Sequence, residues 1–166
     1  MRRFAIAVLL ALLMLVLSVS AAFADSPHFL FADSSVSTST GALTVSFKDA
    51  GLGTGTTSIV ITLKVNTATA VYQCFNNGGN HPKAGNKETV STSLVTSGTF
   101  PVRNGQTTGS LTVGPPSQGS FACPSGQSLF LQSATYLGIF VSDASGNTLE
   151  ATPDPISTGP IHIKIS

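Results

Sequence analysis

The chain has 166 residues, of which eight are Lys or Arg and seven are Asp or Glu, so charged residues make up only 9 % of it. From Asp25 onward it carries six basic and seven acidic residues. Charged residues this few and this evenly balanced do not predict the basic patch with which proteins bind nucleic acids or anionic membranes. A segment of this length fits one domain of the usual size, about 100–150 residues.

The first 24 residues have the pattern of a helical signal peptide. Arg2 and Arg3 precede an apolar run from Phe4 to Val19, and Ala22-Phe23-Ala24 is a small-x-small cleavage motif. An uncleaved anchor needs about 20 apolar residues, and a lipoprotein would have Cys at its new N-terminus. We therefore predict cleavage after Ala24, secretion or cell-surface association, and no membrane span in the remaining chain.

Along the rest of the chain, apolar residues alternate with polar ones. This period of two is typical of strands with one buried face. The C-terminus shows it most clearly, because Ile161, Ile163 and Ile165 alternate with His162 and Lys164. The other alternating segments are residues 43–48, 59–66, 90–94 and 111–113.

Two further segments are apolar without alternation. They are Phe29–Ala32 and Tyr136–Val141, and the second is expected to be a central strand. Turn-forming Gly, Asn and Pro separate the segments, for example at Asn104-Gly105. Residues 25–166 are thus predicted to form one all-β domain, an immunoglobulin-like antiparallel β-sandwich of eight or nine strands. Without any Trp, that term describes the architecture only.

Cys74 and Cys123 are the two cysteines of the chain. Exported proteins fold in oxidising compartments, so a structural disulfide between them is predicted. The alternatives are two buried thiols or a reactive pair. A reactive pair is disfavoured because the spacing is not Cys-x-x-Cys and no Lys or His adjoins either residue.

The segment Asn76–Lys87 is the strongest candidate for a binding site. It is long, rich in Asn and Gly, and anchored at one end by the strand of Cys74. Long ordered loops are often functional, and this one has side chains suited to a sugar or a peptide; the alternative is a flexible connection between strands. The candidate residues are Asn76, Asn77, Asn80, His81, Lys83, Asn86 and Lys87.

Several short motifs lie in the span from Tyr72 to Tyr136: Tyr72-x-Cys74-x-Asn76, Gly79-Asn80, Asn86-Lys87, Thr108-Gly109-Ser110-Leu111, Pro115-Pro116 and Cys123-Pro124-x-Gly126-Gln127. With this set of motifs the span resembles a group of small secreted bacterial β-sandwich proteins of unknown function. The resemblance implies a signal peptide, a β-rich domain and a disulfide, and no activity.

Asp143, Ser145 and Asn147, followed by Glu150, place oxygen atoms at alternate positions, as a calcium loop does. An EF-hand loop has Gly at its sixth position and Glu at its twelfth, whereas here they are fourth and eighth. We therefore predict a hairpin turn and no metal site.

No catalytic pattern stands out. Nucleophilic catalysis requires a base near a Ser or Cys, and the histidines His28, His81 and His162 are scattered, with no Gly-x-Ser-x-Gly motif. We expect no enzyme and no cofactor, with a secreted hydrolase of unrecognised site as the alternative. The expected partner is a cell-surface glycan or protein, although Tyr72 and Tyr136 are the main rings offered for stacking on sugars.

Overall fold

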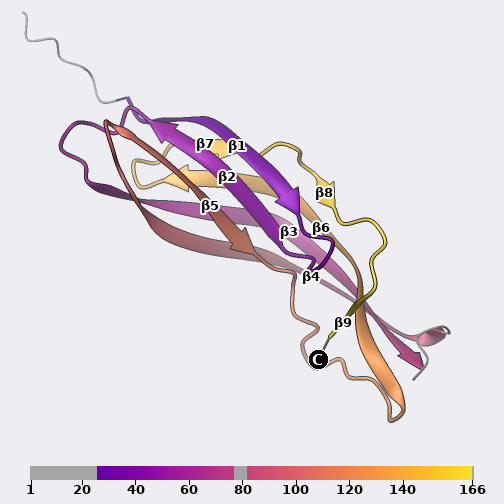
Figure 1. Cartoon of the computed structure of the whole chain (residues 1–166). Coiled ribbons are helices and arrows are strands. Elements are labelled where there is room, and N and C mark those ends of the chain that lie inside the picture. The colour runs from indigo at the N-terminus through magenta and orange to yellow at the C-terminus, as the bar shows by residue number, and fades with distance from the viewer. Residues whose placement is uncertain (1–25, 77–81, 166) are drawn as a thin grey trace, which may run out of the picture.

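The computed structural model describes residues 26–76 and 82–165, and this part of the chain forms nine strands in an elongated molecule with a wide and a narrow end (Figure 1). No helix in this part is long and apolar enough to cross a membrane. The predicted signal peptide lies outside it. The strands are β1 (His28–Val36), β2 (Leu43–Ala50), β3 (Ser58–Asn76), β4 (Pro82–Pro101), β5 (Gln106–Val113), β6 (Gln127–Asp143), β7 (Thr148–Glu150), β8 (Ile156–Ser157) and β9 (Ile163–Lys164).

The strands form two antiparallel sheets. The smaller sheet has the order β1-β2-β5, and the larger has the order β4-β3-β6-β7, with β8 and β9 also paired to β6. At the wide end the sheets face each other (Figure 1). The all-β, antiparallel architecture predicted from the alternating pattern is therefore confirmed.

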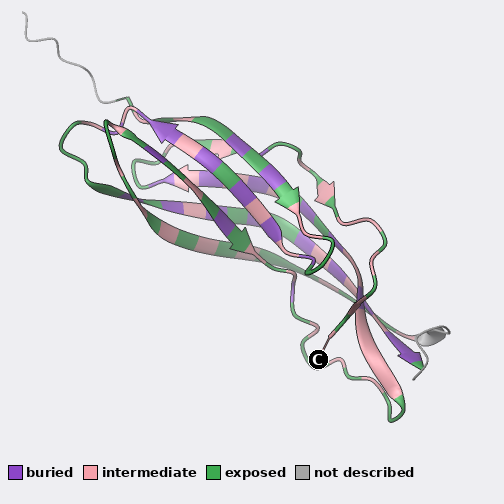
Figure 2. Cartoon of the chain, in the orientation of Figure 1, coloured by how far each residue is buried: buried purple, intermediate pink, exposed green. Residues whose placement is uncertain are grey.

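The main core lies between the sheets at the wide end. Phe47 of β2, Leu63 of β3 and Tyr136 of β6 are each at most 1 % exposed, and buried residues alternate with exposed ones along the strands (Figure 2). The Tyr136 hydroxyl donates to the Gly41 carbonyl at 2.6 Å, which satisfies its polar atom inside the core. The alternating segments thus present the faces that the sequence predicts.

The β4–β5 connection is the tight turn expected at Asn104-Gly105. Both residues have positive φ, 52° and 69°, as a two-residue type I′ hairpin requires. The Arg103 and Gln106 amides each donate to the other residue's carbonyl, at 2.8 and 3.1 Å.

A second core fills the narrow end. Here β3 and β6 continue beyond β5, and residues 114–126 cover the inner face of the larger sheet (Figure 1). Cys74 of β3 is bonded to Cys123 of this covering segment, with 5.6 Å between their Cα atoms; the predicted disulfide is confirmed. The buried members of the second core are Ala70, Tyr72 and Leu131, against which Phe121, Leu129, Ile161, Ile163 and Ile165 pack.

A bulge in β3 lies close to the junction of the two cores, just before Ala68 of the main core and Ala70 of the second core. Its register with β4 shifts between Val65 and Ala68, so β3 has one more residue there than β4. Before the bulge the buried residues of β3 are odd-numbered, up to Val65; after it they are even-numbered, from Ala68 to Cys74. A shift of one residue exchanges the two faces of a strand. Gly138 of β6 lies opposite the bulge. A Cβ atom at this position would be 2.5 Å from Nδ2 of the Asn66 side chain.

One expectation about these strands is corrected by the structure, and the expected central position of Tyr136–Val141 is confirmed. Residues Pro82–Lys87 are assigned to β4 rather than to a loop. In this stretch Lys87 pairs with Gln73 and Pro82 with Phe75, and the register between these two pairs is irregular. The strand Tyr136–Val141 is central in its sheet, but Leu137 on its outer side is 52 % exposed, since none of the described elements covers that face.

Candidate binding groove

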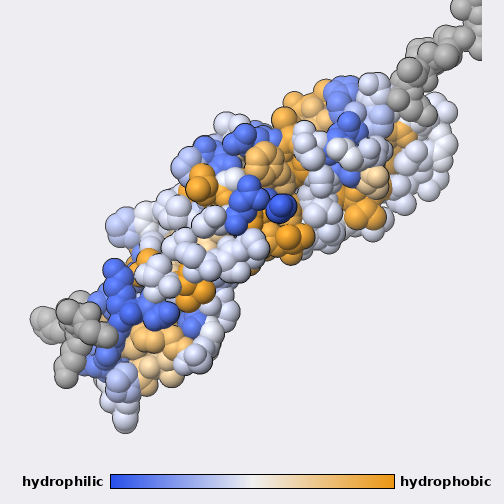
Figure 3. Space-filling model, turned by 180° about the vertical axis from the view of Figure 1, so that it is seen from behind, coloured by the Kyte–Doolittle hydropathy of each residue, from blue (hydrophilic) through white to orange (hydrophobic). Residues whose placement is uncertain are grey.

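The outer face of the larger sheet, turned away from the smaller sheet, carries an open groove of about 420 Å³ near the narrow end. We call it the sheet groove. Figure 3 shows hydrophilic residues gathered beside hydrophobic ones toward this end. Strands β3, β4, β6 and β8 supply its six polar side chains, which are Gln73, Lys87, Gln132, Ser133, Thr135 and Ser157.

One row of cross-strand neighbours passes through the groove. Lys87 of β4 is paired with Gln73 of β3, Gln73 with Phe130 of β6, and Phe130 with Lys164 of β9. Tyr72 and Cys74, on either side of Gln73, are buried in the opposite face, so alternation turns Gln73 outward. The row therefore carries a cation at each end.

A rigid aromatic group adjoins this row. The His162 ring stacks on Phe130 with centroids 4.0 Å apart and an interplanar angle of 18°, and Phe75 meets the imidazole edge-on at 4.6 Å. The Gln132 amide nitrogen donates to His162 Nδ1 at 3.1 Å. An imidazole nitrogen that accepts carries no proton, so the proton of neutral His162 is on Nε2. His162 is exposed and offers this N–H as a donor.

Two of the amides predicted as binding groups, Asn76 and Asn86, make hydrogen bonds within the protein. Asn86 Nδ2 donates to Gln127 Oε1 at 2.8 Å, and Gln127 Nε2 donates to Asn76 Oδ1 at 3.2 Å. This chain of amides joins β4, β6 and β3 at the narrow end and uses Asn86 Nδ2 and Asn76 Oδ1.

The remaining residues of the predicted site are divided. Lys87 lies in the sheet groove. Asn77, Asn80 and His81 lie outside the described residues, and Lys83 lies in β4 with its side chain also outside them. Tyr72 and Tyr136, expected as rings for sugars, are 2 % and 0 % exposed, and burial raises the pKa of Tyr136 to about 12. Neither ring is available to a ligand.

Sequence reasoning missed Gln73, Gln132, Ser133, Thr135 and Ser157. For Gln73 a signal existed: it directly precedes Cys74, so a buried disulfide implies an outward Gln73. The others come from distant segments that only the strand register brings together.

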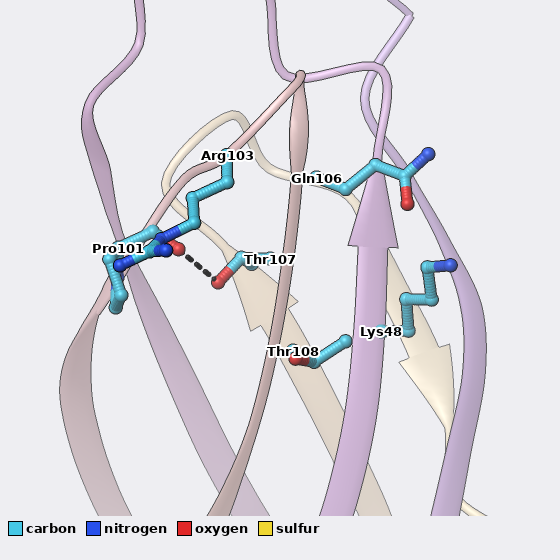
Figure 4. A pocket seen from close by; sticks show the side chains of 6 residues that line it. All are labelled: Lys48, Pro101, Arg103, Gln106, Thr107 and Thr108. Carbon is cyan, nitrogen blue, oxygen red and sulfur yellow. Dashed lines mark hydrogen bonds between the residues drawn. The ribbon is translucent and has the colours of Figure 1, made fainter.

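A second pocket, of about 300 Å³, lies beside the β4–β5 turn and is lined by Lys48, Pro101, Arg103, Gln106, Thr107 and Thr108 (Figure 4). Its polar groups do not converge. Arg103 folds toward Pro101, while Lys48 and Gln106 extend away (Figure 4). Thr107 is occupied by a 2.9 Å hydrogen bond to the Pro101 carbonyl. The sheet groove is therefore the better candidate.

Within residues 26–76 and 82–165, no group of three or more His, Cys, Asp or Glu side chains is placed to hold a metal ion. The carboxylate of Asp143 instead accepts from the Ser145 and Asn147 amides at 2.8 and 2.9 Å and from the Asn147 side chain at 2.8 Å. These bonds close the β6–β7 connection, so the predicted hairpin turn is confirmed.

Asp49 is the most perturbed acid. It is 0 % exposed on the inner side of β2, and neither carboxylate oxygen has a hydrogen-bond partner in the described chain. Burial, with a further contribution from the negative charge of Asp143, raises the pKa of Asp49 to about 6. The nearby backbone amides of Ala50 and His28 and the His28 side chain offset this only in part.

Comparison with protein families, curated proteins and solved structures finds no match to this chain. Its function has therefore to be argued from the groove.

Proposed function

We propose that this protein is an exported, non-catalytic binding module that holds a polysaccharide in the sheet groove. The observation that carries the proposal is the groove lining: hydroxyl and amide side chains on adjacent strands, of the kind that pair with sugar hydroxyls. The proposal includes cleavage of the signal peptide, an immunoglobulin-like sandwich and kinship with small secreted bacterial β-sandwich proteins.

The groove stands on a rigid support, which favours binding because little order has to be gained when a ligand arrives. Gln73 follows Tyr72, whose hydroxyl donates to the Pro116 carbonyl, and precedes Cys74, which is bonded to Cys123. Both anchors lie on the inner face. They fix β3 on its inner side, and its outer face stays accessible to the ligand.

The lining also supports binding rather than hydrolysis. Glycosidases use a pair of carboxyl groups on either side of the scissile bond. None of the described residues that line the groove is Asp or Glu. The groove thus offers groups that bind a sugar but no acid–base pair to cleave it.

Replacing the two groove amides tests this function. We expect Gln73→Ala with Gln132→Ala to weaken polysaccharide binding about tenfold or more, since each lost hydrogen bond contributes about 1 kcal/mol. Affinity electrophoresis against a panel of neutral and acidic polysaccharides measures this. Gln106→Ala with Gln118→Ala, outside the groove, is the matched control.

Unchanged binding by the groove variant, or no binding to any polysaccharide by the native protein, contradicts the proposal. Release of new reducing ends during incubation favours the hydrolase instead.

A further inference from the structure

The cross-strand row that passes through the sheet groove has a cation at each end: Lys87 lines the groove, and Lys164 lies beside Phe130, next to the lining. Lys87 and Lys164 end the cross-strand row, and the two residues between them, Gln73 and Phe130, are neutral. Both lysines are exposed. No acid lines the groove among the described residues. Glu88, which follows Lys87, is paired with the inward-facing Tyr72 and so lies on the opposite face of the sheet.

The polar groups of the face are rich in donors. Each lysine ammonium offers three N–H groups and accepts none. Because Gln132 donates to His162 Nδ1 at 3.1 Å, neutral His162 presents only its Nε2–H outward. The rings of Phe130 and Phe75 hold this imidazole in place. A donor-rich face of this kind favours an anion over a neutral sugar.

The spacing of the lysines indicates a polymer. They lie on β4 and β9, separated by β3 and β6, hence by three strand spacings of about 4.8 Å, or about 14 Å in all. A single acid group does not reach across this distance, but an extended chain with repeated acid groups meets both ammonium groups. Between them, hydroxyl and amide side chains face the neutral part of such a chain.

We propose, on the basis of the function above, that the ligand of the sheet groove is an acidic polysaccharide whose negative groups bind Lys87 and Lys164. A protein partner is disfavoured, since central apolar anchors dominate protein interfaces, and among the described residues the apolar part of the groove lining consists of Val71, Gly159 and Pro160.

Polygalacturonate and the neutral polymer dextran are suitable probes for this proposal. We expect the protein from Asp25 onward to bind polygalacturonate and to bind dextran at least about tenfold more weakly. Exposed ion pairs each contribute about 0.2–1 kcal/mol, so Lys87→Gln with Lys164→Gln should weaken polygalacturonate binding about two- to thirtyfold. Higher salt should weaken it further, through screening.

Lys48→Gln with Lys64→Gln is the matched control, because it removes the same charge outside the groove. Both pairs of lysines lie on the protein surface, so thermal unfolding should show each variant to be folded. Retained affinity in the control and lost affinity in the groove variant support the proposal.

Equal binding of both polymers, insensitive to the groove lysines, overturns the acidic ligand but leaves the proposed function intact. Equal losses in the control and the groove variant show a general charge effect and overturn the site. Binding of neither polymer, nor of any in the wider panel, overturns both proposals.

Discussion

Asp49 lowers the free energy of unfolding at neutral pH, because its charged form is buried. Its carboxyl group is fully buried and without a hydrogen-bond partner in the described chain, and the charged groups that face it are Asp143 on β6 and His28 on β1. The pKa in the folded protein, about 6, lies above the ordinary value of 3.8. The folded state therefore binds the Asp49 proton more tightly than the unfolded state does. Asp49 favours folding below pH 4 and loses this contribution as the pH rises to 6.

Asp49→Asn should therefore raise the free energy of unfolding at pH 7.5 by up to about 3 kcal/mol, because the shift from 3.8 to about 6 corresponds to this amount. The gain should vanish near pH 4, where Asp49 itself is protonated. Urea denaturation at both pH values measures it, with the exposed Asp33→Asn as control. A loss of stability at pH 7.5 would show that the Asp49 carboxylate has a stabilising partner.

At the scale of single elements, β3 is the strand on which both cores and the groove depend. Its inner residues contribute to the main core and the second core, and Cys74 fixes its narrow end to residue 123 across a sequence separation of 49 residues. Loop closure of this length reduces the entropy of the unfolded chain. The second core is small, so the disulfide is a large part of what keeps the covering segment in place.

Cys74→Ala with Cys123→Ala should lower the free energy of unfolding by about 2–5 kcal/mol, the usual cost of removing a disulfide from a small exported domain. Chemical denaturation without reductant measures the change, and reduction of the native protein should reproduce it. Equal stability of the variant and the native protein would show that the second core holds without the bridge.

The sequence predicts which segments of β2, β3 and β5 form strands because their apolar residues alternate. It does not predict the lengths of β3 and β4, since Ser and Thr are frequent in β4 and its described residues have only intermediate burial on their inner side. Pairing at Lys87 and Pro82 extends β4 back along β3. The register between these two pairs is irregular, at the Gly and Asn that favour a turn locally.

Local sequence patterns also indicate some residues of the groove and its row, whereas the positions of others depend on strand pairing. Lys87 was named because the segment Asn76–Lys87 is unusual by itself. The outward direction of His162 and Lys164 followed from alternation with Ile161, Ile163 and Ile165. Their position beside Phe130 depends on the pairing of β9 with β6, which no local pattern contains.

At the scale of the whole molecule, the Cys74–Cys123 disulfide is compatible with the predicted export, because disulfides form and persist in oxidising compartments. If Ala22-Phe23-Ala24 is the cleavage motif, protein recovered from the culture medium should begin at Asp25. Intact-mass measurement tests this directly. Full-length protein in the membrane fraction would contradict it and indicate an uncleaved anchor.

The bulge at Asn66 restricts how this protein can vary during evolution. Side chains alternate between the two faces of a strand, and the bulge exchanges these faces in β3. Cys74 therefore stays on the inner face, toward Cys123, only if residues between the bulge and Cys74 are gained or lost two at a time. Losing one residue there would turn Cys74 to the solvent and Gln73 to the interior. We therefore expect insertions and deletions in this stretch to comprise two residues, so that relatives with different strand lengths would differ by two residues.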